Sequence, residues 1–146
     1  MKYNSDKALV KEVMLVDDEP IDLFICEKLL SALRFADQFV PMPDSMKALE
    51  FLEKRIKSGD CLPQIVFLDY FMPLVDGQDF LERIKIMEAE YPGVFSDTRF
   101  IVLTSLKAPE KRKSLAVYEH VFKVMSKPLN EKSVKELSAL LFQQVS

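Results

Sequence analysis

Five polar residues of this 146-residue chain stand within two positions of the ends of short apolar segments, where side chains commonly do chemistry. They are Asp17, Asp18, Asp69, Thr104 and Lys127. Three carboxylates brought close together repel one another, which raises their pKa values. A bound hard cation relieves this repulsion, and a ligand set made only of oxygen atoms suits Mg²⁺. If the fold gathers these residues, the chain therefore carries a candidate Mg²⁺ site beside one hydroxyl and one ammonium group.

Each of these residues also has an ordinary structural explanation when it is taken alone. Asp17 or Asp18 can cap the helix that follows, and Asp69 can lie solvated in a loop. Thr104 is a β-branched strand residue, and Lys127 is a typical surface charge. These separate explanations account poorly for the occurrence of all five residues after apolar runs.

The elements that position these residues alternate between apolar runs and helical segments. Strands are predicted at 13–16, around 39–40, and at 65–68, 100–103 and 121–125. The second is weaker, and Pro41 and Pro43 are expected to cut it short. Five β-α units with all-apolar strands predict an α/β fold: a flavodoxin-like, doubly wound parallel sheet of order 2-1-3-4-5, with helices on both faces. Ligands bind such sheets at the carboxyl ends of the strands, which is where the five polar residues fall.

Helix signals lie between the predicted strands. Pro20 suits the first turn of a helix, and Asp44 or Ser45 and then Asn130 suit capping positions. The first helix carries an apolar stripe of Ile21, Phe24, Ile25, Leu29 and Leu33, and the third carries Phe80, Leu81, Ile84 and Met87 on one side. The fourth helix is expected from Pro109 to about Tyr118.

Length and charge limit the classes of function. A chain of 146 residues fits one domain, here taken as residues 11–146 after an N-terminal extension of residues 1–10. The net charge of −3 disfavours nucleic acid and anionic membrane surfaces as partners. The longest apolar runs have four residues, whereas a membrane span needs about 20. The polar first residues lack a secretion signal, so the predicted location is cytoplasmic, with Cys26 and Cys61 as thiols.

Four segments together resemble the receiver domain of two-component response regulators. They are Val16-Asp17-Asp18-Glu19, the stretch from Leu68 to Gly77 with its Asp-x-x-Met-Pro-x-x-Asp-Gly pattern, Val102-Leu103-Thr104-Ser105 and Ser126-Lys127-Pro128. The resemblance covers about residues 11–145. The pattern that begins at Asp69 is its most specific part.

The resemblance implies a role for each residue around a phosphoryl group. Asp69 is the expected phosphoacceptor, which takes the group from a histidine kinase or a histidine phosphotransfer protein and becomes an acyl phosphate. Thr104 is expected to donate its hydroxyl to the phosphoryl group and Lys127 to contact one of its oxygens. The Lys127–Pro128 peptide bond is commonly cis in this family.

The resemblance also implies a Mg²⁺ site. Asp18, Asp69 and the backbone carbonyl of Phe71 are the expected direct ligands, and Asp17 is expected to act through a bound water. The cation neutralises charge on the transferred group and orients it for in-line attack.

Several positions depart from the family pattern. Val124 stands where receivers usually carry Tyr or Phe, as a switch coupled to the threonine; Phe122, two residues earlier, is expected on the same strand face. The apolar side chains of Phe71 and Leu106, which flank the expected phosphoryl group, predict slow self-dephosphorylation. The single histidine, His120, has no obvious partner and is assigned no role.

The preferred interpretation is a stand-alone receiver, which is not an enzyme and whose output is a protein contact or a phosphorelay. The main alternative is a receiver-like interaction module that never accepts phosphate. A phosphohydrolase with an aspartate nucleophile would need an acid two residues after Asp69, where Phe71 stands. A flavin or nucleotide site would need phosphate-binding donors, whereas Asp17 and Asp18 repel phosphate and no Gly-rich loop follows the first strand.

Overall fold

A computed structural model describes residues 7–105 and 109–145 of the chain. Its elements are β1 (Val10–Val16), α1 (Pro20–Ala32), β2 (Ala36–Met42), α2 (Ser45–Ser58), β3 (Ile65–Asp69), α3 (Gly77–Glu90), β4 (Arg99–Thr104), α4 (Pro109–Ala116), β5 (Val121–Ser126) and α5 (Glu131–Val145). The strands form a parallel sheet in the order β2-β1-β3-β4-β5. The predicted α/β class and strand order are therefore confirmed.

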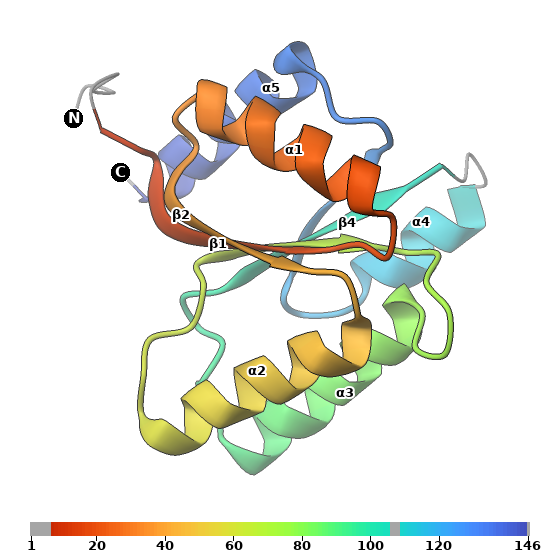
Figure 1. Cartoon of the computed structure of the whole chain (residues 1–146). Helices are drawn as coiled ribbons and strands as arrows, with labels where there is room; N and C mark the ends of the chain where they lie inside the picture. Colours follow the sequence, from red (N-terminus) through yellow and green to blue (C-terminus); the bar gives the residue numbers. More distant parts are fainter. Residues whose placement is uncertain (1–6, 106–108, 146) are drawn as a thin grey trace.

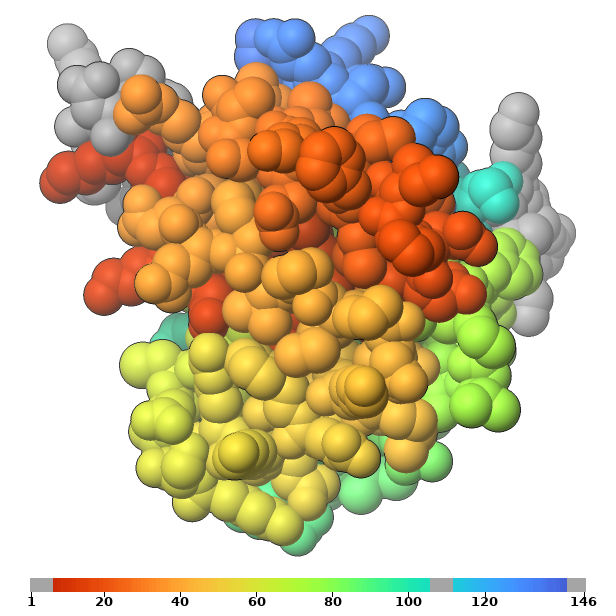
Figure 2. Space-filling view, viewed as in Figure 1, coloured from red at the N-terminus to blue at the C-terminus, as the bar shows by residue number. Residues whose placement is uncertain are grey.

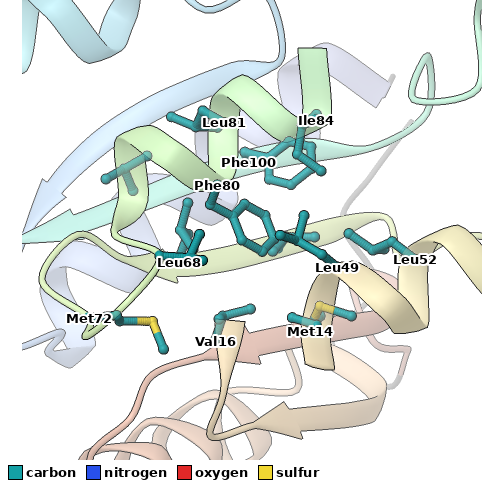
Figure 3. Packing of buried hydrophobic residues seen from close by; sticks show 14 of the residues in the cluster. Met14, Val16, Leu49, Leu52, Leu68, Met72, Phe80, Leu81, Ile84 and Phe100 are labelled. Atoms are coloured by element: carbon teal, nitrogen blue, oxygen red, sulfur yellow. The ribbon is translucent and has the colours of Figure 1, made fainter. Parts of the chain in front are cut away.

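Helices cover both faces of the sheet (Figure 1). Helices α1 and α5 pack on one face, where their leucines and valines meet alternate residues of β1, β3 and β4. Helices α2, α3 and α4 cover the other face. Figure 3 shows this second core, in which Phe80 of α3 points at the sheet between Leu68 of β3 and Leu49 of α2. The predicted inward side of α3 is confirmed, since Phe80, Leu81, Ile84 and Met87 are all buried.

The strands' carboxyl ends gather at one edge, at the right of Figure 1, and the start of β1 and the end of α5 lie at the opposite edge. Asp44 caps α2 by accepting hydrogen bonds from the backbone N–H groups of Met46 and Lys47. Asn130 accepts a hydrogen bond from the backbone N–H of Ser133 at the start of α5. No helix within the described residues is long and apolar enough to cross a bilayer.

The second strand is longer than expected. Pro41 does not end β2, because it stays in register opposite Leu15 and the strand continues to Met42. A proline has no N–H to donate to a sheet, but β2 is an edge strand, so only one of its sides has to be paired.

The apolar stripe of α1 does not face the core as a whole. Leu29 and Leu33 pack against the sheet, beside the buried Leu23 and Leu30. Three other members of the stripe remain exposed; they are Ile21 (72%), Phe24 (63%) and Ile25 (55%). Apolar residues occur around most of this helix, so periodicity alone does not identify its buried side. An exposed apolar surface thus remains on the first turns of α1, which adjoin the carboxyl edge of the sheet.

Candidate functional site

Three carboxylates meet at the carboxyl ends of β1 and β3. Asp17 and Asp18 follow β1, Asp69 is the last residue of β3, and one oxygen from each lies within 4.8 Å of the others. Asp17 and Asp69 are buried, whereas Asp18 is half-buried. Asp17 is held in place locally, because its Oδ1 atom accepts a hydrogen bond from the backbone N–H of Glu19. The structure therefore brings together the three aspartates that the sequence singled out.

Lys127 balances this negative charge. Its Nζ lies 2.8 Å from Asp17 Oδ2 and 3.5 Å from Asp69 Oδ1. It also lies 3.3 Å from Asp22 Oδ2, in the first turn of α1. Sequence reasoning did not single out Asp22. Asp22 lies in the first turn of a helix that begins at the same edge of the sheet, and this position could have indicated that it lies near Lys127.

Burial and neighbouring charges shift the pKa values of the two central groups, Asp69 and Lys127. Burial and the nearby charge of Asp17 raise the pKa of Asp69 to about 6, although Lys127 and a hydrogen bond from the Phe71 backbone partly oppose this rise. Burial disfavours the charged form of Lys127, but its hydrogen bond to Asp17 and the attraction of Asp69 outweigh that effect and raise its pKa. At neutral pH the site thus holds an ionised Asp69 next to a firmly protonated lysine.

The loop after Asp69 is held by close backbone contacts. The Gly77 N–H donates to the Tyr70 carbonyl (2.8 Å), and a Cβ on Gly77 would lie 2.9 Å from the Tyr70 Cα atom. Gly77 is therefore required by this close approach. Ser45 of α2 donates its hydroxyl to the Val75 carbonyl (2.9 Å), and Met72 is buried in the adjoining core. These contacts fix the backbone on which Phe71 lies.

Thr104 and Lys127 lie at the carboxyl ends of β4 and β5, at the same edge of the sheet as the aspartates. Thr104 is the last residue of β4, is 1% exposed, and accepts at its backbone carbonyl a hydrogen bond from the Lys127 N–H (3.2 Å). Residue 103 pairs with Asp69, so Thr104 lies one position further along the next strand. The Lys127–Pro128 peptide bond is cis, as the resemblance led us to expect.

Phe122 does not share a face with Val124, contrary to the expectation from strand alternation. A bulge separates the pairs Phe100–Val121 and Ile101–Lys123, so Phe122 is an extra residue in β5. The bulge turns Phe122 towards the α1/α5 core, whereas Val124 packs on the core under α2, α3 and α4. Phe122 therefore does not stand in for an aromatic residue at position 124.

Two further predictions concern residues around the site. His120 does have an acidic neighbour, because its buried Nε2 lies 3.1 Å from Glu88 Oε1 of α3, although the two atoms do not have hydrogen-bond geometry and form an ion pair only when the imidazole is protonated. Folding brings these distant residues together, and no local pattern in the sequence indicates the contact. The side chain of Phe71 is 52% exposed and packs edge-on against Tyr70, with ring centroids 5.0 Å apart. Leu106 lies outside the described residues.

The donor set fits a hard divalent cation. Three carboxylates with oxygens within 4.8 Å of one another offer several oxygen ligands, and their mutual repulsion disfavours the site without a positive charge. Asp18, Asp69 and Asp17 are thus the residues that would hold Mg²⁺. A ligand role for the Phe71 carbonyl stays a prediction.

Mg²⁺ affinity is expected to fall as the pH drops through about 6, because a proton on Asp69 competes with the cation. For a group with this pKa, the apparent affinity should fall about tenfold between pH 7 and pH 5. Calorimetric titration with Mg²⁺ at pH 5, 6 and 7 measures this. The Asp69→Asn variant is the control. It should bind Mg²⁺ more weakly, and its affinity should depend little on pH. If the Mg²⁺ affinity of the unaltered protein does not change between pH 5 and pH 7, the assignment of Asp69 as a ligand is contradicted.

Comparison with known proteins gives a consistent result. The family model described as response regulator receiver domain matches residues 13–138. The chain is 31% identical over 130 residues to the two-component response regulator ORR1 of Oryza sativa subsp. japonica, covering 88% of this chain and 54% of that protein. It therefore spans about half the length of this rice relative. It is 27% identical over 143 residues to the probable methanogenesis regulatory protein FilR2 of Methanothrix harundinacea, covering 92% of this chain and 87% of that protein.

Solved structures agree on the fold. A two-component response regulator from Cytophaga hutchinsonii superposes with a TM-score of 0.78 at 19% identity, covering 94% of this chain and 99% of that one. A response regulator receiver protein from Dyadobacter fermentans gives 0.73 at 22% identity, covering 90% and 98%. At these identities the likeness establishes the architecture alone.

Proposed function

This chain belongs to the response regulator receiver family, and from that premise we propose that Mg²⁺-dependent phosphorylation of Asp69 switches its contacts with other proteins. The observation that carries the proposal is the Lys127 ammonium group lying against Asp17 and Asp69 in a cluster of three carboxylates. The phosphoryl donor is a histidine kinase or a histidine phosphotransfer protein. The location proposed for this signalling step is the cytoplasm.

In the proposed reaction, a carboxylate oxygen of Asp69 attacks the phosphorus atom of a phosphohistidine. A P–O bond forms, the P–N bond breaks, and the imidazole leaves with the electron pair and takes up a proton. Bound Mg²⁺ would supply charge neutralisation on the phosphoryl oxygens. Lys127 would exchange part of its contact with Asp17 for a phosphoryl oxygen, and the Thr104 hydroxyl would donate to another. The product is an acyl phosphate on Asp69.

We do not assign hydrolysis of external phosphate esters to this site. A phosphohydrolase of this type needs an acid close to the nucleophile to protonate the leaving group. The residue two positions after Asp69 is Phe71, whose side chain has no proton to give. The chain is thus proposed to be a phosphoacceptor rather than an enzyme.

The decisive experiment is intact-mass analysis after incubation with acetyl phosphate, with and without Mg²⁺. The proposal expects one phosphoryl adduct that requires Mg²⁺ and is absent from the Asp69→Asn variant. A histidine-phosphorylated donor protein should give the same adduct. If neither donor yields an adduct, the phosphate-independent interaction module becomes the better interpretation.

The Phe71→Asn substitution is expected to shorten the lifetime of the phosphoryl group about tenfold. Phe71 lies two residues after the phosphoacceptor, and an amide there can hydrogen-bond an attacking water that an aromatic ring excludes or misplaces. The measurement is the decay of the adduct in buffer after acetyl phosphate is removed. Phe71→Leu, which stays apolar, is the control and should decay at nearly the original rate; equal decay of all three proteins would refute this role.

A docking surface for the donor protein adjoins the site. Five large apolar side chains are exposed on the first turns of α1 and the loop after β3; they are Ile21, Phe24, Ile25, Phe71 and Leu74. Helix α1 forms the upper part of the face seen in Figure 2. A donor that reaches the buried Asp69 must approach this edge of the sheet. Exposed apolar side chains next to a reaction site are typical of protein contacts.

The Phe24→Ser substitution is expected to slow phosphotransfer from a protein donor about tenfold, because it removes a large apolar contact of the kind that dominates binding energy. Phosphorylation by acetyl phosphate should not change, since that small donor needs no docking surface. Ile86→Ser on α3 is the matched control, because Ile86 is similarly exposed (64%) on a helix that covers the opposite face of the sheet. Equal slowing by both variants, or slowing with acetyl phosphate, would count against a docking role.

A further inference from the structure

Arg112 is a cation that joins α4 to the end of the strand leading into the site. Its Nη2 donates to Ser126 Oγ (2.6 Å) and its Nη1 donates to the Val124 carbonyl (3.3 Å). Arg112 is on α4, and both acceptors are on β5. Helix α4 is also held by Leu115, which is buried in the core below it. Arg112 and Leu115 are thus two of the described side chains that hold this short helix on the sheet.

The acceptors of Arg112 lie next to the residues proposed to contact the phosphoryl group. Ser126 directly precedes Lys127, whose Nζ contacts Asp17 and Asp69. Ser126 also pairs with Thr104 across β4 and β5. The ends of β3, β4 and β5 are adjacent, so Ser126 and Asp69 are separated by two strand spacings, about 10 Å.

Both present acceptors of Arg112 are electrically neutral. A guanidinium group is always charged, and its planar set of N–H donors matches the oxygens of a phosphate group, to which it can donate two parallel hydrogen bonds. A phosphoryl group on Asp69 would replace the single charge of the carboxylate with about two negative charges, and would bring three acceptor oxygens to this edge. The contact of Arg112 with β5 is therefore poised to weaken when that charge arrives.

We infer that Arg112 transmits the phosphorylation state of Asp69 to α4. On phosphorylation its guanidinium group would give up its hydrogen bonds to Ser126 and Val124 and turn towards the phosphoryl group. This inference rests on the proposed function and assigns the regulatory coupling of the same site. In the unphosphorylated protein the guanidinium ties α4 to β5. After phosphorylation this contact is released, whereas the apolar contact of Leu115 with the core remains. Arg112 is thus a positioning residue, which acts through the placement of a helix.

Hydrogen–deuterium exchange of the peptide that contains α4, measured with and without Mg²⁺ and acetyl phosphate, tests the inference. In the unaltered protein, exchange across α4 should rise at least threefold on phosphorylation. In Arg112→Ala the exchange should already be fast before phosphorylation and should change less than 1.5-fold after it. Arg112→Lys keeps the charge but loses the paired N–H donors that contact Ser126 and Val124, so it should show part of the rise in exchange. Ser126→Ala should reduce the rise in exchange, because it removes the closer acceptor of Arg112.

The control is Lys113→Ala, which removes the neighbouring charge on the same helix. It should keep the full response. Intact mass measured in parallel gives the adduct occupancy of each variant, and the exchange response is compared at equal occupancy. A missing adduct in the unaltered protein would refute the proposed function itself. An adduct with an undiminished α4 response in Arg112→Ala would overturn this inference alone.

Discussion

Replacing Lys127 with methionine is expected to slow phosphorylation of Asp69 by acetyl phosphate about 100- to 1,000-fold, the usual effect of losing one charged contact to a transition state. The Lys127 Nζ is 3.5 Å from Asp69 and 2.8 Å from Asp17, so it is placed to meet charge that develops on the transferred group. Methionine keeps much of the side-chain volume and removes the charge. The adduct mass followed over time measures the rate.

The same substitution is expected to act on Mg²⁺ in the opposite direction. The ammonium group competes with the cation for Asp17 and Asp69, so Lys127→Met should bind Mg²⁺ at least as tightly as the unaltered protein. Without Mg²⁺ it should lose about 1–3 kcal/mol of stability to urea, because a partly buried ion pair has lost its cation. Lys127→Arg keeps the charge and should show the smaller stability loss. An unchanged phosphorylation rate in Lys127→Met would refute the assigned role.

Replacing Asp69 with asparagine is expected to stabilise the protein by about 1–3 kcal/mol at pH 7 without Mg²⁺. Burial and Asp17 raise the pKa of Asp69 from 3.8 to about 6, so the folded state binds the Asp69 proton more tightly than the unfolded state does. The stability that this proton supplies is present below about pH 4 and is lost as the pH rises through 6. Asparagine cannot ionise and avoids that loss.

Urea unfolding at pH 4, 5, 6 and 7 tests this second prediction. The gain in stability of Asp69→Asn over the unaltered protein should be small at pH 4 and should grow to its full value by pH 7. Saturating Mg²⁺ should reduce the gain, because it stabilises the unaltered protein through Asp69. If Asp69→Asn is less stable than the unaltered protein at pH 7, the prediction is wrong. Lys127 would then stabilise the ionised Asp69 by more than burial and Asp17 destabilise it.

The sequence alone determined the strand order of the sheet and which aspartates and lysine meet at its carboxyl edge. Apolar runs such as Ile65–Leu68 mark buried parallel strands, and parallel strands place their carboxyl ends at one edge. For this reason Asp17, Asp69 and Lys127 were predictable as neighbours although Lys127 is 110 residues from Asp17 along the chain. The positions of the aspartates and of the lysine follow from where the strands end, and local runs of apolar residues in the sequence indicate those ends.

Only the tertiary structure decided how those residues are connected to the rest of the molecule. The exposed turn of α1 at Phe24 depends on which side of an apolar helix meets the sheet. The bulge that separates Phe122 from Val124 depends on the register of β5 against β4. The contacts of Lys127 with Asp22 and of Arg112 with Ser126 depend on how α1 and α4 pack on the sheet. The periodicity of apolar residues indicates which positions tend to be buried. The partner of a side chain is instead set by packing between distant segments, which no local pattern predicts.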